Sequence, residues 1–272
     1  MDNKSLKPSL PRTHIYVPTD KNEILKTAVE RINDNIEIRT LWNVINVNAI
    51  NRLGMTDHGP VHFQIVANIG LRLFRILVKN NITPSVVKDF GLTLDHAELV
   101  VVLGCLLHDL GMSINRDGHE EFSLFLANHL LHKLLDFLPV EERVIITSEV
   151  LHAIISHRSG GRPITLEAGV VRVADALDMS EGRSRVPYEA GKVNIHSVSA
   201  VAIERVEIQE GKEKPVQINI EMNNSAGIFQ VDELLKSKLN GSGIEQYFEI
   251  KAYIKDKTEK SLIKEFYIKQ VE

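Results

Sequence analysis

The chain has 272 residues, and its 36 acidic and 32 basic side chains give a formal net charge of −4 at pH 7. This charge gives no general attraction to phosphate backbones, so it argues against long nucleic acids as partners but not against a small phosphorylated substrate. Hydrophobic residues make up 43% and charged residues 25% of the chain, as is ordinary for a soluble globular protein.

The cysteine usage and the apolar runs indicate the compartment. The single cysteine, Cys105, lies inside an apolar run, so it has no internal disulfide partner and is expected to be buried and inert. The N-terminus lacks the apolar core of a signal peptide. The longest strongly apolar stretch, residues 99–107, is too short to cross a bilayer. We therefore expect a cytoplasmic protein with no membrane partner.

Residues 1–22 are polar and contain three prolines, which predicts an extended arm. Residues 23–188 form the predicted helical domain, because apolar residues recur there at steps of three and four. The helical segments are residues 22–54, 62–80, 96–111, 120–138, 140–157 and 165–182, and residues 82–95 are expected to be a linker. The segment 96–111 is apolar almost all round, so it is expected to be the central helix.

The pattern changes after Pro187. Apolar and polar residues alternate in residues 201–209 and 216–222, as in half-buried strands. A short helix is expected next, and a hairpin after it. The helix is predicted at residues 231–239, and the two strands of the hairpin at residues 245–256 and 261–271. Residues 189–272 are therefore predicted to form a small β-β-α-β-β domain, which makes the fold class α+β.

Histidine and aspartate residues interrupt the apolar helices, mostly near helix ends. Six of them come from several different helices: His62, His108, Asp109, His119, His157 and Asp175. Helix bundles build interior metal sites from such inward side chains. Imidazole and carboxylate together suit Fe, Mn, Zn, Co or Ni. The pattern therefore predicts a divalent transition-metal site with one or two ions.

The spacing leaves alternatives open. On a helix, the adjacent His108 and Asp109 project about 100° apart, so one ion beyond the helix end could be held by both. The two carboxylate oxygens of Asp109 could instead bridge two ions. A buried aspartate often pairs with arginine, and Arg172 lies three residues before Asp175.

The ordered set of His62, the "HD" pair at 108–109, His157 and Asp175 resembles the HD superfamily of metal-dependent phosphohydrolases. The sequence "HFQIV" resembles the first helix of that family, "LLHDLG" its central motif, and "VVRVADALD" its last helix. The resemblance covers about residues 52–185. It implies that the predicted domain at 23–188 is an all-α HD-type bundle.

The resemblance also implies roles for the ligand residues. His62, His108, Asp109 and Asp175 would hold the primary ion. His119 and His157 match the two additional histidines of the two-metal subfamilies, where Asp109 would bridge the ions. We expect two ions rather than one.

The motif "HGPVH" is similar to one in class I cyclic nucleotide phosphodiesterases, where the first histidine protonates the leaving oxygen. By this likeness His58 is a candidate general acid, and Asp109 is the other candidate catalytic residue. A capping role for His58 is the alternative. Positive charge for phosphate binding is expected from nearby arginines: Arg52, Arg158, Arg162, Arg183 and Arg185.

The expected activity is hydrolysis of a phosphoester by a metal-activated water, on a small substrate such as a nucleotide or a cyclic phosphate. Two alternatives remain: a diiron oxygenase of the inositol oxygenase type, and a non-catalytic binding or regulatory protein. The C-terminal domain is expected to cap the site, bind an effector or form a homodimer through its edge strands.

Overall fold

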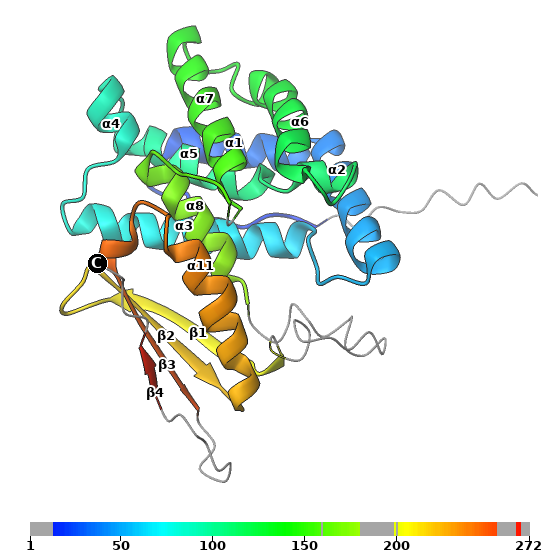
Figure 1. Cartoon of the computed structure of the whole chain (residues 1–272). Coiled ribbons are helices and arrows are strands. Elements are labelled where there is room, and N and C mark those ends of the chain that lie inside the picture. Colours follow the sequence, from blue (N-terminus) through cyan, green and yellow to red (C-terminus); the bar gives the residue numbers. More distant parts are fainter. Residues whose placement is uncertain (1–12, 159, 180–198, 200, 255–264, 268–272) are drawn as a thin grey trace, which may run out of the picture.

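The computed structural model describes residues 13–158, 160–179, 199, 201–254 and 265–267. Figure 1 shows a bundle of helices and a small sheet, with the sheet's own helix α11 lying alongside helix α8 of the bundle. The predicted α+β class is confirmed. The predicted boundary at 188/189 lies outside the described residues, and the domain limits stay predictions.

The bundle is built from helices in the first part of the chain, and three of them begin with a side-chain cap. They are α1 Glu23–Asp34, α2 Ile36–Asn46, α3 Pro60–Lys79, α4 Ser85–Phe90, α5 Leu94–Leu107, α6 His119–Leu134, α7 Val140–Ser156 and α8 Leu166–Leu177, with a π-helix η1 at Val47–Leu53 and a 3₁₀ turn η2 at Leu110–Ser113. The side chains of Asn22, Asn35 and Thr165 each accept a backbone N–H in the first turn of the helix that follows.

Helix α5 is the centre of the bundle. Every residue from Leu99 to Leu107 is buried, and α3, α7 and α8 pack around it. Cys105 is among these residues, and burial raises the pKa of its thiol well above the ordinary value. The predicted central helix and inert cysteine are thus found where the sequence indicates, and α5 ends directly at His108.

Two helical segments of the bundle are long and strongly apolar. Residues 60–79 and 94–113 are long and apolar enough to cross a membrane, so the expectation that no stretch is long enough was wrong. However, 56% and 89% of their apolar windows are buried inside the protein. They are core helices such as a soluble protein also contains.

The predicted linker at 82–95 contains helix α4, which the sequence analysis missed. The Glu167 carboxylate of α8 accepts the N–H groups of Ser85 and Val86 at 3.2 and 3.1 Å, so it satisfies the start of this short helix. Burial raises the pKa of Glu167. A contact more than eighty residues away in sequence has no local signal, which explains the error.

The C-terminal unit is a four-stranded sheet in the order β1-β2-β3-β4. Its strands are β1 Ile203–Glu210, β2 Val216–Met222, β3 Phe248–Ile254 and β4 Glu265–Tyr267. Strand β2 is antiparallel to β1 but parallel to β3, and β3 is antiparallel to β4. The parallel pair needs a crossover, which contains the 3₁₀ turn η3 (Ser225–Gly227), the π-helix η4 (Gln230–Leu235), α11 (Lys236–Leu239) and the 3₁₀ turn η5 (Glu245–Tyr247).

Arg172 of α8 fastens the C-terminal unit to the bundle. Its guanidinium donates to the carbonyls of Ser237 and Lys238 in α11, at 3.3 and 2.7 Å. It also donates to the carbonyls of Ser156, Arg158 and Gly161. The alternative interpretation paired Asp175 with Arg172, but the described ion-pair partners of Asp175 are Lys238, His62 and His108, and the described hydrogen bonds of Arg172 go to backbone carbonyls.

Candidate metal centre

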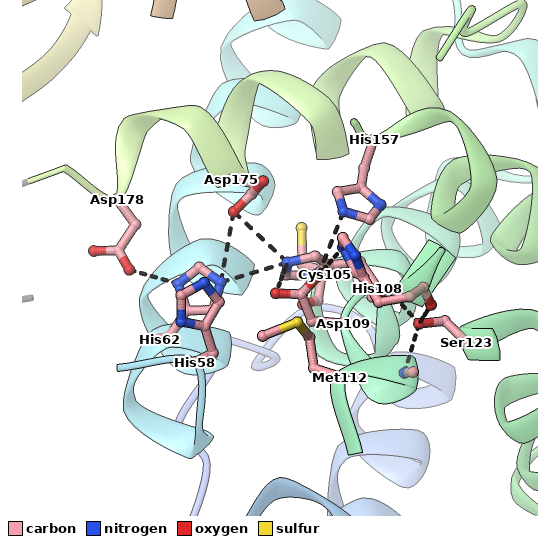
Figure 2. Close-up of polar contacts among 12 residues, drawn as sticks. His58, His62, Cys105, His108, Asp109, Met112, Ser123, His157, Asp175 and Asp178 are labelled. Carbon is pink, nitrogen blue, oxygen red and sulfur yellow. Dashed lines mark hydrogen bonds and ion pairs between the residues drawn. The ribbon is translucent and has the colours of Figure 1, made fainter. Parts of the chain in front are cut away.

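The six predicted ligands meet in the interior of the bundle, as Figure 2 shows for five of them. None is more than 8% exposed. They lie in the first turn of α3, at and just after the end of α5, at the start of α6, at the end of α7, and in α8: His62, His108, Asp109, His119, His157 and Asp175. The packing of these helices thus brings together residues as far apart in the sequence as His62 and Asp175.

One group of ligand atoms gathers between α3, α5 and α8. Nε2 of His62 and Nε2 of His108 lie 3.5 and 3.6 Å from Oδ1 of Asp175. Nε2 of His108 also lies 3.6 Å from Oδ2 of Asp109. Ligand atoms around an ion with bonds of about 2.1 Å lie roughly 3–3.5 Å apart, so this group has the spacing of a metal site.

A second group shares Asp109 with the first. Oδ1 of Asp109 lies 3.0 Å from Nε2 of His119 and 3.5 Å from Nε2 of His157. The two carboxylate oxygens therefore face different histidines, Oδ2 toward His108 and Oδ1 toward the other two. This is the geometry of a bridging carboxylate, and the donor set fits a divalent metal.

The other nitrogen of three ligand histidines is held by the backbone. Nδ1 lies close to a carbonyl three residues earlier: 2.9 Å for His108 with Cys105, 2.9 Å for His119 with Arg116, and 2.6 Å for His157 with Ile154. A carbonyl can only accept, so Nδ1 carries a proton in each of the three rings, and an ion bound at Nε2 would displace any proton that this nitrogen shares with the carboxylates. Such a partner fixes the tautomer that a metal needs.

The surroundings of Asp109 and Asp175 favour the ionised form of each carboxyl group. Burial by itself raises the pKa of Asp109, but the charge of His108 and hydrogen bonds from His119 and His157 hold that pKa well below its ordinary value. Burial by itself also raises the pKa of Asp175. The charge of Lys238 and the hydrogen bond from His108 outweigh burial and hold that pKa well below its ordinary value. The ionised carboxylate is the form that binds a cation, so these surroundings favour metal binding.

The HD domain family matches residues 62–180, an interval that encloses all six ligands. The chain belongs to the HD-domain superfamily. Over 246 residues it is 42% identical to the uncharacterized protein MJ1020 of Methanocaldococcus jannaschii, covering 90% of this chain and 94% of that protein. No solved structure matches the chain significantly.

Asp178 supports the first ligand group from behind His62, and the sequence patterns did not single it out. Its Oδ2 lies 2.6 Å from Nδ1 of His62, and its side chain is buried beside the end of α8 (Figure 2). His62 thus has a carboxylate where the other three ligand histidines have a carbonyl. A signal was present, because Asp178 is three residues after Asp175 in the HD motif "VVRVADALD".

Replacing Asp178 with asparagine is expected to weaken metal binding by about 10- to 100-fold, the usual effect of losing the partner of a ligand histidine. The measurement is competition for the metal with a chelator. Asp34→Asn, at an exposed position in α1, is the control and keeps the wild-type affinity. Equal metal affinity in Asp178→Asn and the control would contradict this role.

His58 lies next to the ligands without being one of the clustered groups. Its ring is 5.5 Å from that of His62, its Nδ1 is 2.8 Å from the Thr56 carbonyl, and it is 6% exposed. Helix α3 begins only at Pro60, so the two histidines are close because the chain turns at Gly59 and not because they share a helix face. A Cβ at Gly59 would lie 2.5 Å from the Asn46 side chain, so any other residue there would have to displace that side chain.

Three of the five predicted phosphate-binding arginines lie among the described residues: Arg52, Arg158 and Arg162. Arg52 donates to Asn48 at 2.8 Å, and Arg162 is exposed in the loop before α8. Arg158 ion-pairs at 2.8 Å with Glu120, whose other oxygen is 3.0 Å from Nδ1 of His119. Arg158 therefore lies near the candidate ligand His119, with its guanidinium in an ion pair with Glu120. The last two candidates, Arg183 and Arg185, lie outside the described residues.

Proposed function

We propose that the protein is a metal-dependent phosphohydrolase that cleaves a phosphoester of a small substrate, a nucleotide or a cyclic phosphate. The observation that carries the proposal is the orientation of Asp109, whose oxygens face two separate groups of histidines. This supports a site for two ions, with Fe, Mn, Zn, Co or Ni as suitable metals. Membership of the HD superfamily supports the reaction class.

Two divalent ions, when bound, supply a water of lowered pKa and positive charge for the phosphate oxygens. Asp109 would hold both ions at a fixed separation through its two oxygens. Asp178 and the three backbone carbonyls keep the ligand histidines in the required tautomer and orientation. The chain's own contribution to the attack is therefore a pre-arranged set of ligands.

His58 is the proposed acid for the leaving oxygen. Nδ1–H of His58 donates a hydrogen bond to the Thr56 carbonyl, so in the imidazolium the transferable proton is the one on Nε2. His58→Ala is expected to lower kcat by about 10²- to 10⁴-fold, the usual contribution of a general acid, with unchanged metal content. His132→Ala, at an exposed position in α6, is the control. Equal kcat values in both variants would leave His58 as a capping residue.

The proposal is tested by phosphate release from a panel of nucleotides and cyclic phosphates, with and without oxygen. The proposal expects metal-dependent phosphate release that is the same without oxygen. Oxygen consumption that depends on a substrate would point instead to the oxygenase alternative. Bound metal without turnover of any phosphate compound would point to a regulatory protein.

Location and assembly remain proposals. We expect the protein to act in the cytoplasm, because its cysteine is buried and its apolar helices lie in the core. Strands β1 and β4 are the two edges of the C-terminal sheet, and such edges can pair with a second copy. A homodimer through the C-terminal unit is therefore expected, and the mass of the protein in solution tests it.

A further inference from the structure

Helix α11 of the C-terminal unit brings a cation to the metal centre. The ammonium of Lys238 forms an ion pair with Oδ2 of Asp175, whereas Oδ1 of Asp175 faces His62 and His108. The side chain of Lys238 is 20% exposed and that of Asp175 is 10% exposed. Lys238 therefore lies where the buried ligand group approaches solvent.

The position of Lys238 is fixed by the packing of the two units. Its own carbonyl accepts a hydrogen bond from Arg172, which stands one turn before Asp175 on α8. Leu235 and Leu239, on either side of Lys238 in the crossover, are fully buried or nearly so. The bundle thus anchors the backbone of α11, and the ammonium reaches Asp175 from an anchored helix.

The charge of Lys238 stands beside the first ligand group. Oδ2 of Asp175 carries the ion pair with Lys238, and Oδ1 of the same carboxylate lies 3.5 and 3.6 Å from Nε2 of His62 and of His108. The described arginines near the site are placed differently: Arg158 pairs with Glu120, Arg172 donates to backbone carbonyls, and Nη1 of Arg116 lies 3.3 Å from Nδ1 of His119, the nitrogen that faces away from Asp109. Among the described Lys and Arg residues, Lys238 has the ion pair that reaches a ligand directly.

We propose that Lys238 binds the phosphate group of the substrate, so that the C-terminal unit completes the active site of the bundle. This inference rests on the proposed phosphohydrolase function and names a residue for it. Bound ions would take up the charge of Asp175 and leave the ammonium of Lys238 to a second anion. A lysine ammonium suits a phosphate oxygen as a compact point charge with three donors.

The test titrates inorganic phosphate into the metal-loaded, full-length protein by calorimetry. Phosphate is expected to bind Lys238→Met about 10- to 100-fold more weakly than wild type, as for the loss of one charge-assisted hydrogen bond. Lys238→Arg is expected to keep most of the affinity. Lys236→Met is the matched control, because Lys236 is in the same helix but pairs with Asp232 at 2.8 Å. Metal content is measured in each sample and is expected to stay unchanged.

Two results would overturn the proposal: unchanged phosphate affinity in Lys238→Met, or a loss of phosphate affinity fully explained by lost metal. In the second case Lys238 only positions Asp175. If Lys238→Met fails to fold, acetylation of lysines in the wild type decides. Phosphate is expected to protect Lys238 but not Lys236, as read by mass spectrometry, and equal reactivity with and without phosphate would overturn the proposal.

The two proposals fail separately. Phosphate binding that depends on Lys238, without phosphate release from any substrate, would overturn the phosphohydrolase and keep Lys238 as an anion-binding residue. Phosphate release by a protein whose phosphate affinity does not depend on Lys238 would overturn only the role of Lys238.

Discussion

Asp109→Ala is expected to abolish phosphate release and to lower the metal content below one ion per chain. Asp109 is the residue that both ligand groups share, with Oδ2 facing His108 and Oδ1 facing His119 and His157. Its removal takes a ligand from each ion at once. The loss should therefore exceed the roughly 10- to 100-fold effect expected for a residue behind a ligand, such as Asp178.

The measurement combines metal analysis with an assay of phosphate release. Asp117→Ala is the matched control, because Asp117 is exposed in the loop that follows the HD motif. It is expected to keep both ions and full activity. Asp109→Ala should remain folded without metal, since the surrounding core is apolar and complete. Wild-type metal content in a folded Asp109→Ala protein would contradict the assignment of the ligands.

Gly111→Ala is expected to destabilise the protein by about 3 kcal/mol or more, at or above the upper end of the usual cost of overpacking. A Cβ at Gly111 would lie 2.0 Å from the His119 carbonyl oxygen and 2.7 Å from the Ser123 backbone nitrogen. Both are backbone atoms of α6, so no flexible side chain can move away. The whole helix must shift instead, and it carries His119 with it.

The hydroxyl of Ser123 holds Gly111 against the start of α6. Its hydroxyl accepts the N–H of Gly111 at 2.8 Å and lies 2.7 Å from the carbonyl oxygens of both His108 and His119. Gly111→Ala should therefore also weaken metal binding through His119. Urea unfolding of the metal-free protein measures the stability. Gly160→Ala is the control, because a Cβ there meets nothing within 4 Å. Equal unfolding midpoints in the two variants would contradict this account.

The ligand set was predictable because the sequence marks it twice. Histidine and aspartate stand at the ends of strongly apolar helices, and their order follows the HD pattern. The structure brings all six together, including His119, whose helix begins where Gly118 adopts a left-handed backbone with φ 70°. The candidate ligands and a bridging role for Asp109 could thus be predicted, while which histidines each oxygen of Asp109 faces appears only in the geometry.

Other parts of the site had weaker signals or none. Asp178 lies in the motif "VVRVADALD", but it directly follows the end of α8, and the sequence alone does not show that it faces His62. Lys238 is 63 residues beyond Asp175 and belongs to a short helix of ordinary composition, so only the docking of the two units reveals it. Helix α4 was missed for the same reason, because Glu167 stabilises it from a distance.

The central claim is that two ions share Asp109, and metal content per chain tests it most directly. The wild type, loaded with manganese or iron and freed of excess metal, is predicted to hold two ions per chain. His119→Ala is predicted to hold one, and His129→Ala, an exposed position in the same helix, is predicted to hold two. One ion in the wild type with no change in His119→Ala would contradict the claim.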